Sequence, residues 1–410
     1  MDKKLFYQMY PIPFTYPVWD NDPLKPLKSY GLWEMQDELP KLQELGVDVI
    51  WLSACLNSPR LDHGYDVSDY MRIDPQVGLM RDPPTFPDFV HMAHQMGMKV
   101  IIDLVLNHCS VQHPWFLSRK ENYFYWANQP KDGWHNLFDD GSAWEYDASS
   151  KKYYLHMFHK SQADLAWFDA DGRLNETLVK EFRRIIGFWL SPVYGEVDGF
   201  RLDVPQSINK DINADELRFG DMLYGDKAKQ VINALFDGFN CLLVMECFDP
   251  TYGEILNSYI QDTPVQYGMN ILVKGLEQDM GQMIHKSAQT PGFVLDLESH
   301  DSCRFLSRKG MTLEHELEFL FDSGAQNVCL YQGQEFGLKN PMLTKEQVMA
   351  LDAQAAMRMA RGESFESLRD ISRANARVPL PEGEYKRQDL SSELTPFKKF
   401  KEMISLWKMC

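Results

Sequence analysis

The stretch that decides the fold is KVIIDLVLNH at residues 99–108, an apolar, β-branched run that contains one acid and leads into Asn107–His108. A run that is apolar nearly throughout is typical of a strand buried on both faces of a parallel sheet. Similar runs recur at Lys4–Tyr10, Val47–Ser53, Val197–Val204, Cys241–Glu246, Phe293–Leu297 and Val328–Tyr331, with a weaker one at Pro264–Leu272. The sequence therefore predicts eight strands.

Helical periodicity fills the intervals between these runs, most clearly at Leu174–Leu190, Met311–Phe321 and Phe397–Trp407. Asn175 offers an N-cap for the first of these segments. Alternation of strands and helices predicts an α/β fold with right-handed crossovers. Eight such units favour a (β/α)₈ TIM barrel over an open sheet.

One interval breaks this alternation. Residues 109–167 show little helical period and contain many aromatic residues. About sixty residues are too many for an ordinary connection, so we predict an inserted domain at 109–167, after the third strand. The barrel would then comprise residues 1–108 and 168–410. The connection after the eighth strand is expected to be short.

Composition narrows the classes of partner. The 410 residues are 44% hydrophobic and 25% charged, which are ordinary values for a globular protein. Lys plus Arg is 42 and Asp plus Glu is 59, which gives a net charge of −17. A surface this acidic repels phosphate backbones and anionic lipid, so we expect no nucleic acid and no membrane as partners.

The sequence also favours a cytoplasmic location. It begins without an apolar signal region, and no stretch approaches 18 apolar residues, so neither a signal peptide nor a membrane span is expected. Cys55, Cys241 and Cys329 lie in or beside the strand-like runs, where reduced, packed thiols are expected. The absence of any CxxC pair argues against a thiolate zinc site.

Charged side chains follow several of the predicted strands. The third carries Asp103, the fourth Arg201 and Asp203, the fifth Glu246, and the seventh leads into His300–Asp301. An α/β barrel brings the carboxyl ends of its strands together at one mouth, where its active site lies. Two carboxyl groups facing each other across a glycosidic bond are what sugar hydrolysis requires. The pattern therefore indicates a glycoside hydrolase.

The neighbours of the two acids suggest their roles. Asp203 has Arg201 two residues before it, which favours an ionised nucleophile. Glu246 is flanked by apolar residues, Met245, Cys247 and Phe248. Apolar surroundings would let Glu246 keep its proton and act as the acid.

Four segments, in this order, resemble the conserved regions of the α-amylase superfamily, glycoside hydrolase family 13. They are Asp103–His108, Gly199–Asp203, Glu246, and Ser299–Asp301 followed by Arg304. The resemblance implies a (β/α)₈ barrel with an inserted domain B, and a retaining mechanism. It makes Asp203 the nucleophile and Glu246 the acid/base, with Asp301 stabilising the oxocarbenium-like transition state.

The resemblance also implies a set of substrate-binding residues. It assigns Tyr65, in a GYDxxDY-like segment, to stacking on the sugar in the −1 subsite, and Asp62 and Arg377 to gripping the terminal glucose. The remaining residues assigned to binding at this subsite are Asp103, His108, Arg201 and His300.

Finer features resemble the oligo-1,6-glucosidase and dextran glucosidase branch. They are Gln162–Leu165, the segment RANARVP at 373–379, in which Ala374 replaces the acid of the branch's RDNARTP, and Val204 directly after the nucleophile. They imply a retaining α-glucosidase that releases glucose from the non-reducing end of short α-glucosides, notably α-1,6-linked isomalto-oligosaccharides. A glucosyltransferase or sucrose isomerase using the same intermediate stays open, as does, more remotely, a non-catalytic amylase-like binding protein.

The sequence departs from the family in three places. The C-terminal β-domain is expected to be absent, and Ser299 stands where the family usually has Asn, which would weaken binding in the −1 subsite slightly. The family's calcium loop is hardly recognisable in Asp20–Asp22, so no metal or cofactor is expected to be required. The expected partner is a small neutral oligosaccharide, and the oligomeric state is left open.

Overall fold

The computed structural model describes residues 2–11, 31–78, 85–138, 140–274, 280–378 and 395–409. Its central sheet has eight parallel strands: β1 (Lys4–Met9), β2 (Val49–Leu52), β5 (Lys99–Val105), β12 (Gly199–Asp203), β14 (Leu242–Cys247), β15 (Tyr267–Asn270), β16 (Val294–Asp296) and β17 (Asn327–Tyr331). Each strand neighbours the next in chain order, and β17 returns to β1. A parallel bridge from Gly268 to Phe293 joins β15 to β16, so the sheet closes into the predicted barrel.

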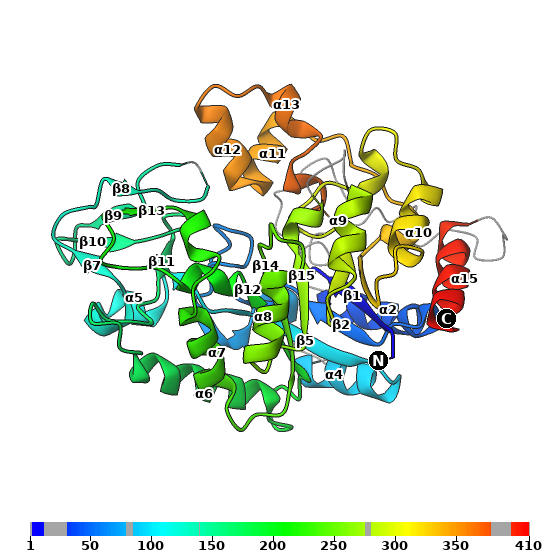
Figure 1. The fold of residues 1–410 in the computed structure, drawn as a ribbon, viewed down its shortest axis with the longest axis horizontal. Coiled ribbons are helices and arrows are strands. Elements are labelled where there is room, and N and C mark those ends of the chain that lie inside the picture. The colour runs from blue at the N-terminus through cyan, green and yellow to red at the C-terminus, as the bar shows by residue number, and fades with distance from the viewer. Residues whose placement is uncertain are drawn as a thin grey trace.

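Helices cover the outside of the barrel (Figure 1). They are α2 (Gly31–Leu45), α4 (Phe86–Gln95), α6 (Glu176–Leu190), α7 (Lys227–Phe236), α8 (Glu254–Asp262), α9 (Met280–Ser287), α10 (Leu313–Phe321) and α15 (Pro396–Met409). The three helices predicted from periodicity correspond to α6, α10 and α15, and the side chain of Asn175 caps α6 as expected. None of the helices in the described ranges is both long and apolar enough to cross a membrane.

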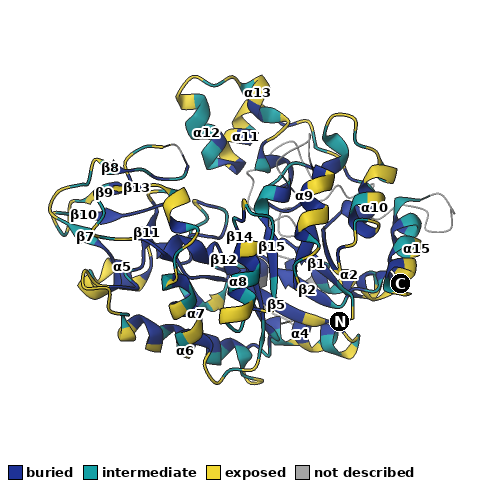
Figure 2. Ribbon diagram, in the orientation of Figure 1, coloured by how far each residue is buried: buried dark blue, intermediate teal, exposed yellow. Residues whose placement is uncertain are grey.

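The barrel strands are buried on both faces, as their composition predicted (Figure 2). Because successive side chains alternate, each strand supplies two cores. The inward-facing residues Phe6, Val49, Trp51, Ile101, Val244, Met269, Val294 and Cys329 form a compact cluster inside the barrel. Outward-facing residues such as Phe200 and Leu202 belong to the larger core between the strands and the helices.

A segment with its own sheets follows β5. Its strands are β6 (His108–Ser110), β7 (Trp126–Ala127), β8 (Gly133–Trp134), β9 (Trp144–Asp147), β10 (Lys152–Leu155) and β11 (Gln162–Asp164). β7, β10 and β9 form one antiparallel sheet, and β6 pairs with β11. A strand from beyond β12, β13 (Glu216–Leu217), pairs with β8. The insertion after the third strand is thus present, while its boundaries at 109 and 167 stay a prediction.

The connection after the eighth strand is long, and the prediction of a short one is wrong. It contains α11 (Lys345–Leu351), α12 (Ala353–Ala360) and α13 (Phe365–Arg369), which lie to one side of the barrel (Figure 1). We call residues 343–378 the cap; its small core contains Leu343, Val348, Leu351, Ala355, Leu368, Ala374 and Val378. Helices of seven, eight and five residues are too short to display a sustained helical period.

Gly199 permits the close approach of β12 to β14. A Cβ at this position would lie 1.8 Å from the backbone oxygen of Leu242, so one of the two strands would have to move. We expect Gly199→Ala to lower the free energy of unfolding by about 3 kcal/mol, measured by urea denaturation.

Gly187→Ala is the matched control for this substitution. Gly187 lies in α6, and a Cβ there would meet only the ring of Phe239 at 3.9 Å. This variant should instead be stabilised by about 1 kcal/mol, because alanine is the better helix former. A Gly199→Ala variant as stable as the wild type would contradict the close approach.

Candidate active site

A pocket of about 300 Å³ lies at the mouth of the barrel, where the strands reach their carboxyl ends. Seven of the ten predicted site residues line it: Asp62, Tyr65, His108, Asp203, Glu246, Asp301 and Arg377. The other three, Asp103, Arg201 and His300, are at most 2% exposed. Hydrogen bonds and ion pairs connect these three to residues that line the pocket. The structure therefore brings all ten predicted residues together.

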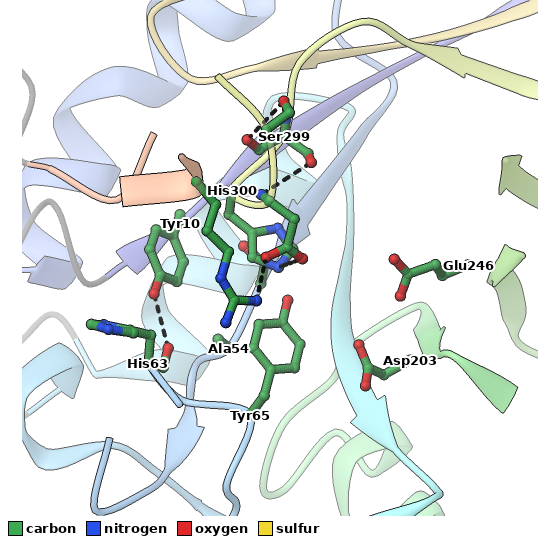
Figure 3. A network of polar contacts seen from close by, with 12 residues as sticks. Tyr10, Ala54, His63, Tyr65, Asp203, Glu246, Ser299 and His300 are labelled. Carbon is green, nitrogen blue, oxygen red and sulfur yellow. Dashed lines mark hydrogen bonds and ion pairs between the residues drawn. The ribbon is translucent and has the colours of Figure 1, made fainter. Parts of the chain in front are cut away.

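Asp203 and Glu246 face each other from adjacent strands (Figure 3). Asp203 is the last residue of β12, and Glu246 is the last but one of β14. Both carboxylates point into the same space, with the hydroxyl end of Tyr65 on the other side of it (Figure 3). The pair of acids inferred from the sequence is thus placed on one side of the pocket.

The residue after Asp203 has an unusual backbone conformation. Val204 has φ 33° and ψ 55°, in the left-handed region that β-branched residues rarely adopt. Its carbonyl oxygen accepts hydrogen bonds from the backbone N–H and the hydroxyl of Ser207, which hold the turn. Strained backbone of this kind concentrates at functional sites, and here it ends β12 and places the side chain of Val204 against the pocket.

The guanidinium of Arg201 binds three carboxylates. Nη1 donates to Asp103 Oδ1 at 3.1 Å and to Asp203 Oδ1 at 2.5 Å, and Nη2 donates to Glu246 Oε2. We call these four residues the Arg201 cluster. One cation is thus shared by both acids that face the pocket and by a third acid behind them.

Asp103 anchors the back of the pocket. Its carboxylate accepts hydrogen bonds from Trp51 Nε1 at 3.1 Å, from the backbone N–H of Ala54 at 2.8 Å and from the hydroxyl of Tyr65 at 2.9 Å. The ring of Tyr65 in turn stacks on His300, with centroids 5.0 Å apart. Asp103 therefore positions the residues that line the pocket and does not line it itself.

The protonation of Asp203 differs from the expectation. Burial raises the pKa of Asp203 well above its usual value of 3.8, and the charges of Glu246 and Asp103 act in the same direction. Arg201 lowers this pKa, as the sequence suggested, but burial outweighs it. Burial therefore favours the protonated form of Asp203.

The surroundings of Glu246 also differ from the expectation. Met245 and Cys247 point away from the pocket into the core under the helices, because side chains alternate along β14. Only Phe248, of the three apolar neighbours in sequence, lines the pocket. The nearest polar partner of the Glu246 carboxylate is the guanidinium of Arg201. The predicted apolar surroundings of Glu246 are therefore present on the side of Phe248, but its carboxylate also contacts a cation.

Asp301 is held as a carboxylate by three cationic or polar side chains. Arg377 Nη2 donates to it at 2.5 Å, Arg373 Nη1 at 3.3 Å, and His300 Nε2 lies 2.8 Å away. On the other side of the ring, Gln8 Nε2 lies 2.7 Å from His300 Nδ1. Although burial opposes ionisation, His300, Arg377 and Arg373 together lower the pKa of Asp301 well below 3.8.

Asp62 lies between the barrel and the insertion. Gln162 Nε2, on β11, donates to Asp62 Oδ2 at 2.9 Å and lies 3.1 Å from His108 Nε2. Burial opposes ionisation of Asp62, but Arg373 and Arg377 lower its pKa. Burial lowers the pKa of His108 to about 4, so this imidazole is neutral near pH 7.

Sequence reasoning missed Arg373. The resemblance assigned Asp62 and Arg377 to gripping the terminal glucose. The side chain of Arg377 is 1% exposed, and its Nη1 lies 3.9 Å from Asp62 Oδ1. Arg373 donates to Asp62 at 3.3 Å, and its side chain is 13% exposed and lines the pocket. Both arginines lie in the quoted segment RANARVP and both line the pocket, but the order of residues alone could not show that Arg373 is the more exposed of the two and the nearer to Asp62.

An apolar group of pocket residues was predicted only in part, through Val204 and Phe248. It comprises Leu137, Phe138, Phe158, Val204, Phe219, Phe248 and Ile271. Phe219 and Phe248 form an edge-to-face pair with ring centroids 4.6 Å apart. Phe219 comes from a single 3₁₀ turn (Phe219–Met222), an element without a sequence signature.

A larger cavity, of about 510 Å³, lies between the insertion and α6. It contains none of the predicted site residues, and several of its polar side chains have partners. Glu121 pairs with Lys152 at 2.9 Å, and Asn175 caps α6 while donating to the carbonyl oxygens of Asn122 and Ala166. This cavity does not offer the facing acids found at the barrel mouth.

The described ranges contain no group of three or more His, Cys, Asp or Glu side chains arranged to hold a metal ion. The segment Asp20–Asp22, named above for its weak likeness to a calcium loop, lies outside the described residues.

Comparisons with known proteins agree with this geometry. The sequence profile of the α-amylase catalytic domain matches residues 29–235. An oligo-1,6-glucosidase of Heyndrickxia coagulans is 28% identical over 92% of this chain and 76% of its own length. A glucan 1,6-α-glucosidase of Streptococcus pneumoniae is 31% identical over 87% of this chain and 71% of its own length.

The fold also matches solved structures. A trehalose-6-phosphate hydrolase of Bacillus licheniformis superposes with a TM-score of 0.81 and 24% identity, covering 100% of this chain and 84% of that protein. At this level of identity the match establishes a shared fold, which is the barrel described above.

Removing the shared cation should destabilise the protein. In Arg201→Leu, three buried carboxyl groups would lose their only common cation, and we expect the free energy of unfolding to fall by about 3–5 kcal/mol. Burial raises the pKa of Asp203 and Arg201 lowers it, so without the guanidinium this pKa would lie further above its value in the unfolded state. The deficit relative to wild type should therefore shrink as the pH falls and the carboxyl groups take up protons.

Arg184→Leu is the control, measured by the same urea titration. Arg184 pairs with Glu181 on the exposed face of α6 at 3.2 Å, with 60% of its side chain exposed. Loss of such a surface pair costs about 1 kcal/mol or less. Equal losses of unfolding free energy in the two variants would show that the buried Arg201 cluster stabilises the protein no more than a surface ion pair does.

Proposed function

Because the chain belongs to the α-amylase family of glycoside hydrolases, we propose that it hydrolyses short α-glucosides and releases glucose from their non-reducing ends. This proposal depends on one observation, the pair of facing acids Asp203 and Glu246. They line a pocket in which Asp62 also forms ion pairs with two arginines.

The reaction follows from the positions of three acids. The carboxylate of Asp203 attacks the anomeric carbon, the glycosidic C–O bond breaks, and Glu246 gives its proton to the leaving oxygen. Water then attacks the glucosyl ester and gives a proton to Glu246, and the carboxylate of Asp203 departs with the bonding electrons. Asp301, whose pKa is low, stays ionised and stabilises the positive charge that develops on the sugar ring.

This chemistry needs one proton on the pair of acids. Arg201 contacts both carboxylates, and burial raises the pKa of Asp203. Hydrolysis begins when the leaving oxygen of the substrate lies beside Glu246 and Asp203 is ionised. Arg201 lowers the pKa of Asp203 and so favours the ionised form that attacks the sugar.

The acid–arginine side of the pocket suits the terminal sugar. Asp62, Arg373 and Arg377 offer hydrogen-bond acceptors and donors at fixed positions, which match the hydroxyl groups of one glucose unit. His108 and Gln162 lie beside them and add neutral polar groups. A pocket that recognises the end of a chain favours release of single glucose units over cleavage within a polymer.

The apolar pocket residues favour a neutral aglycone. Val204, Phe219, Phe248 and Ile271 can contact the CH groups of a second sugar but offer no charge. Among the described residues that line the pocket, the cations are Arg373 and Arg377, and both are bound to carboxylates. A phosphorylated substrate would therefore find no unoccupied cation there, and we propose uncharged isomalto-oligosaccharides as substrates.

The relatives support the α-1,6 linkage in this proposal. The relatives from Heyndrickxia coagulans and Streptococcus pneumoniae are called oligo-1,6-glucosidase and glucan 1,6-α-glucosidase. The sequence features at Gln162–Leu165 and Val204 point to the same branch. We further propose that the reaction uses these side chains without a metal or cofactor, since they already supply nucleophile, acid and charge stabilisation, and that the protein acts in the cytoplasm.

Substitution of the nucleophile tests the proposed function directly. The wild type should release p-nitrophenol from p-nitrophenyl α-glucoside, and Asp203→Ala should lose at least about 10⁴-fold in kcat. Glu246→Gln should be similarly slow on isomaltose, whose leaving group needs the proton.

Product analysis separates hydrolysis from transfer. Chromatography after incubation with isomaltose, maltose or concentrated sucrose should show glucose as the main new product. Isomerised or lengthened sugars would mean that a sugar hydroxyl, instead of water, attacks the glucosyl ester. A wild type as inactive as Asp203→Ala on a broad panel of α-glucosides would rule hydrolysis out.

The pH profile tests the electrostatics of the pair. The charge of Asp103 contributes to the raised pKa of Asp203. Asp103→Asn should lower that pKa, so the acid limb of kcat/KM should move to lower pH, by about one unit or less. Asp262→Asn, which removes an exposed carboxylate on α8, should leave the limb in place. A shift of the Asp103→Asn limb to higher pH would contradict the assignment of that limb to Asp203.

A further inference from the structure

We propose that Asp352, in the cap, is a positioning residue that fixes the guanidinium of Arg373 and thereby sets how tightly the pocket binds the terminal glucose. This inference rests on the proposed function and extends it to a residue 149 positions after the nucleophile in the chain. It links the cap, which the sequence did not predict, to recognition of the sugar.

Three carboxylates surround the Arg373 guanidinium. Nε donates to Asp352 Oδ1 at 3.2 Å, Nη1 to Asp301 Oδ1 at 3.3 Å and Nη2 to Asp62 Oδ1 at 3.3 Å. Asp62 and Asp301 both line the pocket, whereas Asp352 is 4% exposed and belongs to the cap. Asp352 is therefore the partner of Arg373 that a sugar cannot displace.

The carboxylate of Asp352 is itself fixed. Oδ1 accepts a hydrogen bond from the backbone N–H of Ala355, which caps α12, and Oδ2 accepts one from the hydroxyl of Ser372 at 2.7 Å. Ser372 directly precedes Arg373, and its hydroxyl also accepts from the N–H of Ala374. The short helix α12 and the start of the RANARV segment are thus tied together through one carboxylate.

The sequence of this segment explains why the partner comes from elsewhere in the cap. Ala374 stands at the position where the related motif has an acid. Its methyl group is fully buried in the small core of the cap, beside residues such as Val348 and Leu368. Position 374 therefore supplies packing instead of charge, and the acid bound to Arg373 on the cap side is Asp352.

A fixed Arg373 matters because its two other partners have different tasks. Asp62 belongs to the terminal-sugar side of the pocket, and Asp301 stabilises positive charge on the reacting sugar ring. Without Asp352, the long side chain of Arg373 would gain rotational freedom, and ordering it on sugar binding would cost more. The main expected consequence is weaker binding of glucose, with a smaller effect on the chemical step.

The test is a double-mutant cycle between Asp352→Asn and Arg373→Gln. Asparagine keeps the N-cap and can still accept from Ser372, but it removes the charge that holds Arg373. Two quantities are measured for the wild type, both single variants and the double variant: the Kd of D-glucose by calorimetry, and KM and kcat on p-nitrophenyl α-glucoside.

We expect Asp352→Asn to raise the Kd of glucose and the KM about tenfold and to change kcat less than about threefold. In the Arg373→Gln background it should change neither value by more than about twofold, because its effect passes through Arg373. Asp352→Glu, which keeps the charge, should recover part of the loss. An unchanged Kd in Asp352→Asn, or equal losses in both backgrounds, would overturn the proposal.

Two controls separate this proposal from folding defects and from the proposed function. Glu363→Gln removes an acid from the Arg358–Glu363 ion pair elsewhere in the cap and should leave Kd and kcat unchanged. Thermal melts of all variants report on folding. If the wild type binds glucose with a non-additive cycle but hydrolyses no α-glucoside, the proposed function fails and the positioning role stands. If the wild type hydrolyses α-glucosides but the cycle is additive, the proposed function stands and the positioning role of Asp352 is wrong.

Discussion

The interaction on which the active site depends is the sharing of one buried guanidinium, that of Arg201, by three carboxylates. Each of these charges would cost several kcal/mol to bury alone, so the acids and the cation require one another. The barrel supplies the geometry, because β12 pairs with β5 in a register that sets Arg201 beside Asp103. A slip of one residue would turn Arg201 and Asp203 toward the helices. The register of the central strands therefore determines the chemistry at the mouth.

The charge distribution around the pocket favours the proposed neutral sugar over a charged ligand. Arg201, Arg373 and Arg377 are each already bound to acids, and His108 is neutral near pH 7. The pocket can therefore bind a ligand through hydrogen-bond acceptors, through donors that are shared with carboxylates, and through the faces of aromatic rings. Hydroxyl groups can join such a network without disturbing its charge balance. An anionic ligand would have to compete with Asp62 or Asp301 for a guanidinium, on a protein of net charge −17.

The parts of the fold that could be predicted are those in which local pattern and burial coincide. All eight strands appear where apolar runs occur, because a strand buried on both faces can contain little else. The acids at the strand ends could be predicted to lie together because parallel strands of a barrel bring their carboxyl ends to the same side. The surroundings of Glu246 were misjudged, since neighbours in a strand point to opposite faces. The cap was missed because very short helices leave no periodic pattern. Arg373 was missed because a linear motif does not show which of its arginines lies nearer to Asp62.

The two arginine networks have different structural origins, and this separates their functions. The Arg201 cluster is built entirely on barrel strands β5, β12 and β14, whose positions are fixed by the closed sheet. The contacts of Arg373 join the loop that carries Asp62, the end of the seventh strand and the cap, three parts of the chain with no shared sheet. Precise placement of reacting groups benefits from the rigid element, whereas recognition of one end of a sugar can be adjusted in a loop or small helical cap without moving the barrel. In the proposed reaction the barrel would therefore carry the bond-breaking step, and the cap would be the part in which substrate preference can change.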